Sequence, residues 1–167
     1  MRQVLFVLIF LMFLPLTASA KKETYTIASS IPFAEGSGVR DNVKEECGFE
    51  TRLPEYIRKK AKRGVNVVLT DEPLGKVNGK VLFLEITNVF ALGGGGYSGS
   101  KSAIVSGELK ENGELIGSVT ARRRTLFSMR VGTCSMLKRV AEKLGEDIAD
   151  WLREPTMDAK LGDIKDD

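Results

Sequence analysis

The chain has 167 residues, of which 43% are hydrophobic and 28% are charged, and its formal net charge is +3. So small a net charge argues against nucleic acid as a partner, because polyanion binding needs a dominant positive field. The chain contains no histidine, which excludes Ser-His-Asp and Cys-His nucleophile pairs and every histidine-ligated metal site. We therefore predict a protein that is not an enzyme, with no catalytic residues, no cofactor and no metal site.

The first 20 residues have the pattern of an export signal. Arg2 precedes an uninterrupted apolar run over residues 4–14, and small residues at 18–20 stand before Lys21. The run is shorter than the roughly 20 apolar residues of a spanning helix, so residues 1–20 predict a cleaved signal peptide, with retention as an anchor left open. No cysteine stands near the cleavage point to accept a lipid. We expect a periplasmic or secreted protein that does not span the membrane after cleavage.

The remaining chain is long enough for one domain with a hydrophobic core and too short for two. We place this single domain at residues 21–153. We expect the acidic tail, residues 154–167, to be disordered because it has few apolar side chains. Cys47 and Cys134 are the only cysteines, and in an oxidising compartment such a pair predicts a disulfide. Two buried free thiols are the alternative.

The first half of the domain predicts a strand, a loop and a helix. Residues 22–29 alternate loosely and predict the strand, while residues 30–50 hold proline and several glycines with few apolar residues and predict a long loop. Thr51 can cap a helix over residues 52–63. The apolar positions of this helix recur at a spacing of four, at Leu53, Ile57 and Ala61.

Four more strands are predicted after this helix. Residues 65–69 and 80–91 predict two of them, and the second is the expected central strand because it is apolar on both faces near its start. Residues 102–110 and 114–124 predict a β-hairpin.

Two turns can close this hairpin. A two-residue Asn-Gly turn would pair Val105 with Thr120, whereas a three-residue loop with a left-handed Gly113 pairs Val105 with Val119 and Leu109 with Leu115. We prefer the three-residue loop because every inward partner is then apolar or glycine. The outward face is then mostly polar, and it carries Ser102, Ser106, Glu108, Ser118, Thr120 and Arg122, interrupted by Ile104 and Ile116.

Thr133 predicts the start of a last helix, which Glu154 and Pro155 end. Its apolar stripe consists of Leu137, Val140, Ala141, Leu144, Ile148 and Leu152. Together the elements predict an α+β fold with a mixed, largely antiparallel sheet of about five strands and two helices packed on one face. A bridge between Cys47 and Cys134 would place the N-termini of both helices at the same end of the sheet.

A glycine-rich segment, residues 92–102, joins two of the strands. Gly94 and Gly99 have the spacing of a phosphate-binding loop, but Ser100 stands where that loop needs lysine, and a strand follows where it needs a helix. We therefore predict no nucleotide site here. The segment is either a flexible connection or a recognition loop with Tyr97 as its one large side chain.

Basic side chains cluster at residues 58–63 and again near the end of the hairpin. Strand alternation places Arg122 and Arg124 on the outward face of the sheet and Arg123 on the opposite face. Such a cluster suits lipid phosphates, anionic glycans or an acidic partner, with an ordinary solvated surface as the alternative.

Three features of the second half occur together. They are the glycine run at 93–99, the hairpin at 103–124, and a helix that begins near Cys134 and ends in Asp-Ile-Ala-Asp-Trp-Leu at 147–152. In this combination the chain resembles an uncharacterised bacterial family of secreted proteins and lipoproteins, a domain-of-unknown-function group. The resemblance implies a fold similar to envelope accessory domains, such as the lipoprotein activators of peptidoglycan synthases and the N-terminal domain of the Tol-system propeller protein. Those relatives bind other envelope proteins and catalyse no reaction.

We therefore expect a non-catalytic binding or assembly-accessory module of the bacterial cell envelope, with another envelope protein as its partner. The residues expected near that partner are Gly94, Gly95, Gly96, Tyr97, Arg122 and Arg124. Two alternatives stay open. One is an exported enzyme or enzyme inhibitor whose site the pattern does not reveal, and the other is a binder of anionic envelope glycan or lipid.

Overall fold

The computed structural model describes residues 22–62, 64–92, 99–125 and 132–164. Within these residues the chain forms six β-strands, three α-helices and one short 3-10 helix. In chain order they are β1 (Glu23–Ala28), α1 (Asp41–Cys47), α2 (Phe49–Lys60), β2 (Val65–Thr70), η1 (Leu74–Lys76), β3 (Lys80–Phe90), β4 (Ser102–Glu111), β5 (Glu114–Arg124), α3 (Thr133–Trp151) and β6 (Ala159–Gly162). The signal peptide predicted at residues 1–20 lies outside the described residues.

The strands form one mixed sheet in the order β2-β1-β3-β4-β5-β6. The three longest strands, β3, β4 and β5, pair antiparallel, whereas β1 pairs parallel with both β2 and β3, and β6 pairs parallel with β5. The predicted mixed α+β sheet is therefore confirmed in outline. It has six strands where about five were predicted, and three α-helices in the described residues where two were predicted.

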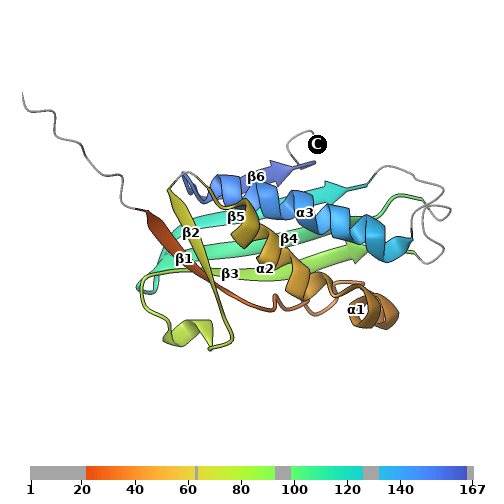
Figure 1. Cartoon of the computed structure of the whole chain (residues 1–167), viewed down its shortest axis with the longest axis horizontal. Coiled ribbons are helices and arrows are strands. Elements are labelled where there is room, and N and C mark those ends of the chain that lie inside the picture. The colour runs from red at the N-terminus through yellow and green to blue at the C-terminus, as the bar shows by residue number, and fades with distance from the viewer. Residues whose placement is uncertain (1–21, 63, 93–98, 126–131, 165–167) are drawn as a thin grey trace, which may run out of the picture.

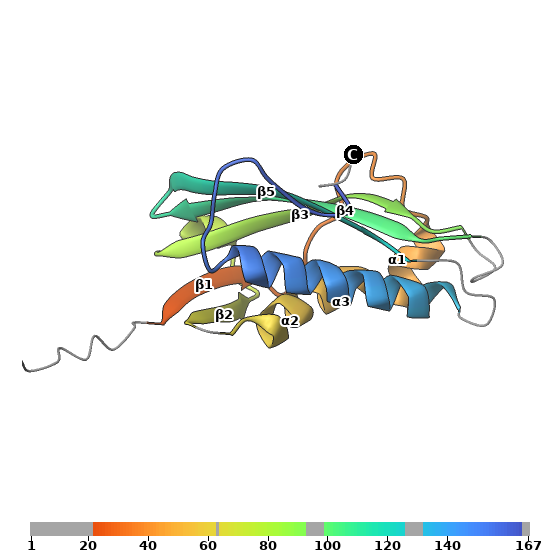
Figure 2. The same cartoon turned by 90° about the horizontal axis from the view of Figure 1, so that it is seen from above.

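Helices α2 and α3 lie side by side on one face of the sheet, and α1 lies at its end (Figures 1 and 2). Within the described residues, no α-helix covers the opposite face. The core fills the space between the sheet and the two long helices, and the predicted apolar stripe of α3 is fully buried in it. Gly145 allows the close contact of the helices, because a Cβ there would lie 2.6 Å from Cβ of Tyr56 and 3.0 Å from the backbone nitrogen of Ile57.

Helix α1 occupies part of the stretch that was predicted to be a long loop. It has one buried face, formed by Val43 and Cys47, and it ends at Gly48 in the left-handed conformation that glycine adopts without strain. Two apolar residues are too few for a periodic pattern to reveal so short a helix. The chain before α1 is also ordered, because Ile86 of β3 donates a backbone hydrogen bond to Pro32 (2.8 Å) and accepts one from Ala34 (2.9 Å).

The turn of the β4–β5 hairpin differs from the one we preferred. Asn112 (φ 51°) and Gly113 (φ 92°) form a two-residue turn, so that Glu111 pairs with Glu114. This turn is stabilised by Gly79, whose backbone nitrogen donates to Asn112 Oδ1 (3.0 Å) and whose carbonyl accepts from Asn112 N (3.0 Å).

A β-bulge between Leu109 and Lys110 then changes the register of the hairpin. Val105 lies opposite Ala121, and not opposite the predicted Val119. From the bulge to the end of the hairpin the shift is two residues, so the side chains there keep their predicted faces, since side chains alternate with a period of two. At the bulge the prediction was wrong, because Leu115 lies opposite Lys110 and is exposed, and Ile116, predicted to face outward, packs against the core.

Residues 154–164 of the acidic tail were wrongly predicted to be disordered, and residues 165–167 lie outside the described residues. Within it, β6 pairs with residues 119–122 of β5. Ser118 Oγ accepts a hydrogen bond from the Asp158 backbone nitrogen (2.7 Å), and Arg123 donates to Asp163 (3.2 Å). Strand pairing and polar contacts with the domain therefore order a segment that has few apolar groups of its own.

The predicted disulfide is confirmed. Cys47 at the end of α1 is bonded to Cys134 in the first turn of α3, with their Cα atoms 4.8 Å apart. The bond places the start of α2 beside the start of α3, as expected for two helices that begin at the same end of the sheet. It also fits the oxidising compartment of an exported protein.

In the part of the chain that the structure describes, no helix combines the length and apolar character needed to cross a membrane.

Candidate functional site

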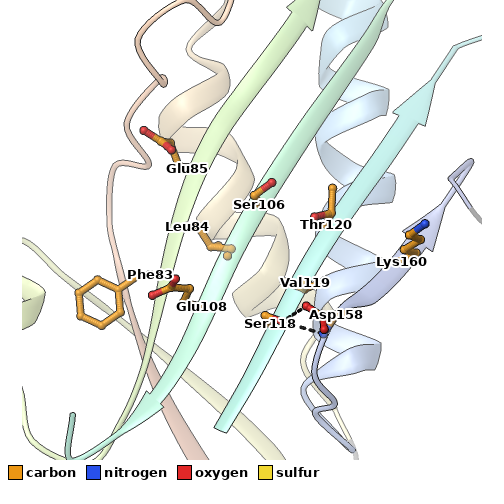
Figure 3. Close-up of a pocket in the computed structure, with 11 residues that line it drawn as sticks. Phe83, Leu84, Glu85, Ser106, Glu108, Ser118, Val119, Thr120, Asp158 and Lys160 are labelled. Atoms are coloured by element: carbon orange, nitrogen blue, oxygen red, sulfur yellow. Dashed lines mark hydrogen bonds between the residues drawn. The ribbon is translucent and has the colours of Figure 1, made fainter. Parts of the chain in front are cut away.

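The candidate site lies on the face of the sheet that α2 and α3 leave open. Strands β3, β4, β5 and β6 expose alternate side chains there, and Figure 3 views this face with the helices behind it. The two central strands carry small hydroxyl side chains, while longer charged or aromatic side chains stand on the outer strands and at the lower end of β4. Small residues in the middle and larger ones at the rim make the surface concave.

The register of the strands brings four of these side chains into one row across the sheet, which we call the hydroxyl row. Glu85 of β3 lies opposite Ser106 of β4, Ser106 lies opposite Thr120 of β5, and Thr120 lies opposite Lys160 of β6. The four side chains follow one another in this order in Figure 3. The row therefore has a carboxylate at one end, an ammonium group at the other, and two hydroxyl groups between them.

A second row lies directly beside the first, and its polar side chains are paired within the protein. Phe83 lies opposite Glu108, and Glu108 lies opposite Ser118. Glu108 forms an ion pair with Lys110 (2.8 Å), and Lys110 Nζ also lies 5.2 Å from the centre of the Phe83 ring. Ser118 Oγ donates to Asp158 Oδ1 at 3.1 Å. We call these side chains the paired row.

The two rows line a shallow groove with a volume of about 530 Å³. Its lining comes from β3, β4, β5 and the tail, and it consists of Phe83, Leu84, Glu85, Ser106, Gly107, Glu108, Ser118, Val119, Thr120, Asp158 and Lys160. A volume in this range is comparable with that of small-molecule sites, but the groove is open along the sheet, whereas small-molecule sites bury most of the ligand. The arrangement suits an elongated polar ligand that lies on the surface.

The far wall of the groove depends on how the tail is held. Arg123, at the end of β5 on the helix side, donates to both carboxylate oxygens of Asp147 on α3 (2.6 and 2.7 Å) and to Asp163 (3.2 Å). The hydrogen bond to Asp147 is the main reason why the pKa of Arg123 lies above its ordinary value. Gly162 also fits only as glycine, because its φ is +68° and a Cβ would lie 2.3 Å from the carbonyl oxygen of Arg122.

Among the three arginines, contacts fix the side-chain direction of Arg123, and it is the predicted one. Arg123 faces α3, away from the groove residues of β5. Arg122 lies one outward position beyond Thr120, and the backbone nitrogen of Arg124 donates to Asp163 (2.8 Å). Both arginines thus lie just past the end of the groove. Their part in partner binding stays a prediction.

The other residues predicted near a partner, Gly94, Gly95, Gly96 and Tyr97, lie outside the described residues. Strand β4 begins at Ser102, as predicted, where a phosphate-binding loop would be followed by a helix. Lys101 is fully buried, its Nζ donates to the carbonyl of Gly99 (3.2 Å), and burial lowers its pKa. Among the described residues, no group of three or more histidine, cysteine, aspartate or glutamate side chains is placed to hold a metal ion.

Sequence reasoning found four of the seven polar side chains that line the groove. It placed Ser106, Glu108, Ser118 and Thr120 on the outward face, and the structure places them there. It missed Glu85, Asp158 and Lys160. The alternation of charged and apolar residues around Glu85 was a usable signal, whereas the other two residues were missed because the tail was set aside as disordered.

No family model matches the chain, and no curated protein matches it. Among solved structures, the PelC dodecamer from Paraburkholderia phytofirmans is 16% identical, with 77% of this chain and 89% of that chain covered and a TM-score of 0.46. A putative neuraminyllactose-binding hemagglutinin homolog from Helicobacter pylori is 9% identical, with 81% and 85% covered and a TM-score of 0.43. A minor lipoprotein from Acinetobacter baumannii is 14% identical, with 81% and 95% covered and a TM-score of 0.39. Likenesses this weak say nothing about function, and the resemblance to an uncharacterised bacterial family stays a prediction.

Proposed function

We propose that the mature protein is a non-catalytic binding module of the bacterial cell envelope, periplasmic or secreted, that holds a partner protein on the open face of its sheet. The observation that carries this proposal is the groove itself. It is a concave surface with rows of polar side chains on the sheet face opposite α2 and α3. Three strands build it together with the tail, which strand pairing and hydrogen bonds hold in place.

The charges of the groove favour a protein over an anionic polymer. Three carboxylates, on Glu85, Glu108 and Asp158, stand beside the single ammonium group of Lys160 in the lining. A uniformly anionic glycan or lipid surface would meet more repulsion than attraction there. A protein surface carries both signs of charge and can match both.

Two of these three carboxylates are poorly suited to catalysis in the arrangement observed. Glu108 is held in an ion pair with Lys110, and Asp158 is hydrogen-bonded to Ser118. Both acids are thus committed to structural contacts, and the groove is too open to exclude water from a reaction. This supports the proposal that the protein binds and does not catalyse.

The proposal is tested by capture from envelope extract with a wild-type protein and two matched arginine variants. Ser106→Arg fills the middle of the groove, whereas Ser135→Arg makes the same change on the exposed start of α3. The affinity tag belongs at the N-terminus of the mature protein, because the C-terminal tail forms a wall of the groove. We expect the wild type and Ser135→Arg to retain a partner protein at moderate salt, and Ser106→Arg to retain none.

If Ser106→Arg retains the same proteins as the wild type, the groove is not the contact surface. Before capture, thermal unfolding should show that both variants fold like the wild type. Tyr97→Ala and Arg122→Ala test the two side chains that the sequence predicts near a partner in addition to the groove. Unchanged binding by both variants would remove those residues from the site.

A further inference from the structure

The hydroxyl row differs from the rest of the groove because its polar groups are not used within the protein. Among the described residues, the side chains of Glu85, Ser106, Thr120 and Lys160 make no hydrogen bond or ion pair with one another or with a neighbour. The paired row beside it, in contrast, satisfies its charged groups internally. The four polar side chains of this row can therefore form hydrogen bonds and ion pairs with a ligand.

The span of this row sets the length of what it recognises. Neighbouring strands lie about 4.8 Å apart, so the three spacings from β3 to β6 place the backbones at Glu85 and Lys160 about 14 Å apart. The two ends carry opposite charges, and the hydroxyl groups lie at about one third and two thirds of this distance.

An extended polypeptide matches these intervals. Its residues advance about 3.4 Å each, and alternate side chains point to the same side, so residues i, i+2 and i+4 present side chains at about 0, 7 and 14 Å on one face. A basic residue at i would meet Glu85 while an acidic residue at i+4 meets Lys160. A small polar residue at i+2 would lie above the hydroxyl groups of Ser106 and Thr120.

We infer that the partner presents an extended segment with the pattern basic-x-polar-x-acidic, which lies across the strands along the hydroxyl row. The inference rests on the proposed function and names the chemistry of its partner. A chain that crosses a sheet face at a right angle has a counterpart in orthogonal sheet packing, so the geometry is an ordinary one for proteins. The head group of a zwitterionic phospholipid is far shorter than this span, and a polymer with charges of one sign matches only one end.

The probe is a seven-residue peptide, acetylated and amidated, with lysine second, serine fourth and glutamate sixth and threonine at the other positions. Binding is measured from the shifts of backbone amide NMR signals in ¹⁵N-labelled protein. We expect saturable shifts at Ser106, Thr120 and Lys160. A peptide of the same composition with lysine and glutamate adjacent should bind more weakly, and so should one with lysine in place of the glutamate.

Matched variants locate the two charged contacts. Glu85→Gln and Lys160→Gln should each lower the affinity for the peptide by about two- to fivefold, as expected for the loss of an exposed ion pair. Glu114→Gln makes the same chemical change as Glu85→Gln at an exposed position at the hairpin end of β5, outside the groove, and should leave the affinity unchanged.

The double variant Glu85→Lys with Lys160→Glu gives the most specific test. It should restore the affinity for the original peptide and reverse the direction in which the peptide lies, which a spin label on the peptide N-terminus reports. Equal binding of the peptide with adjacent charges, or unchanged affinity in both glutamine variants, would overturn the inference. If the peptides fail while Ser106→Arg still abolishes capture of a partner, this inference is wrong and the proposed function stands; if capture is also unaffected, both are wrong.

Discussion

Arg123 on β5 and Asp147 on α3 are joined by two parallel hydrogen bonds of 2.6 and 2.7 Å, and the same guanidinium group reaches Asp163 in the tail. One side chain thereby connects the sheet, the helix layer and the C-terminal segment. Both partners in the first pair are partly buried, with side-chain exposures of 32% and 16%. Water therefore screens this pair less than an ion pair on the open surface.

Replacing this arginine should loosen the tail and lower stability. We expect Arg123→Met to reduce the free energy of unfolding by about 1–3 kcal/mol, since charge-assisted hydrogen bonds are lost and two carboxylates are left without their partner. Arg153→Met is the matched control, because Arg153 forms only an exposed pair with Asp150 and should cost no more than about 0.5 kcal/mol. Urea unfolding measures both. Equal losses in the two variants would mean that the cluster contributes no more than a surface pair.

The close contact between α2 and α3 predicts that alanine in place of Gly145 lowers the stability of the fold. Gly145→Ala improves helix propensity by about 1 kcal/mol, but the new methyl group would meet Tyr56 and Ile57 and should cost about 1–3 kcal/mol through overpacking. We therefore expect a net loss in the urea midpoint. Gly75→Ala is the control, because a Cβ there meets nothing within 4 Å. A stabilised Gly145→Ala variant would show that the helices separate at little cost.

The disulfide should make stability depend strongly on reductant. Its two cysteines are 87 residues apart, and for a loop of this length the chain-entropy relation gives about 4–5 kcal/mol as an upper figure. We expect dithiothreitol to lower the urea midpoint of the wild type substantially. It should have no effect on a Cys47→Ala and Cys134→Ala double variant, which already unfolds at the lower concentration. A reductant effect of the same size in both proteins would point to a cause other than this bond.

Stability should fall in alkaline solution because Tyr25 of β1 and Lys80 of β3 lose their protons there. Burial raises the pKa of the Tyr25 hydroxyl, and the hydrogen bond to Glu23 raises the pKa of Lys80, whose Nζ lies 5.6 Å from the Tyr25 ring. Both groups hold their protons more tightly in the folded chain than in the unfolded one. Their contribution is therefore complete below about pH 10 and is lost as the pH rises through the folded values.

This dependence is measured from urea midpoints at pH 8 and pH 11. Tyr25→Phe removes the tyrosine part of the effect, so the variant should lose less stability between the two pH values than the wild type does. An identical loss in both proteins would assign the alkaline effect to other groups. Because Lys80 and Glu23 remain in the variant, part of the pH dependence should persist.

The hairpin shows which part of the fold the sequence predicts well. Val105 and Val119 were predicted to face the core, and they are 1% and 3% exposed, although neither has the predicted partner. Alternation determines the face of each side chain from local sequence. The register depends on the turn and the β-bulge together. The Asn112-Gly113 turn was one of the two alternatives in the sequence, and we did not prefer it because it would pair Val105 with Thr120; the bulge that instead places Val105 opposite Ala121 has no local signal.

The tail shows why two residues of the groove, Asp158 and Lys160, were missed. Its few apolar residues gave no reason to expect order, yet Asp158, Lys160 and Asp163 are positioned by contacts with β5 and by strand pairing. Such contacts are tertiary, and they appear only once the edge of β5 and the guanidinium group of Arg123 are placed. A composition rule for disorder considers the tail alone and does not include the surface that receives it.

The construction of the groove from a terminal segment has an evolutionary consequence. In β6, Ala159 and Leu161 pack against the core, while Lys160 lines the groove and its side chain makes no hydrogen bond or ion pair among the described residues. Under the proposed function, substitutions of Lys160 would change which partner is recognised at little cost to stability. The scaffold and part of the selectivity would then depend on different residues, so that descendants of one ancestral chain could acquire new partners by a substitution near the C-terminus.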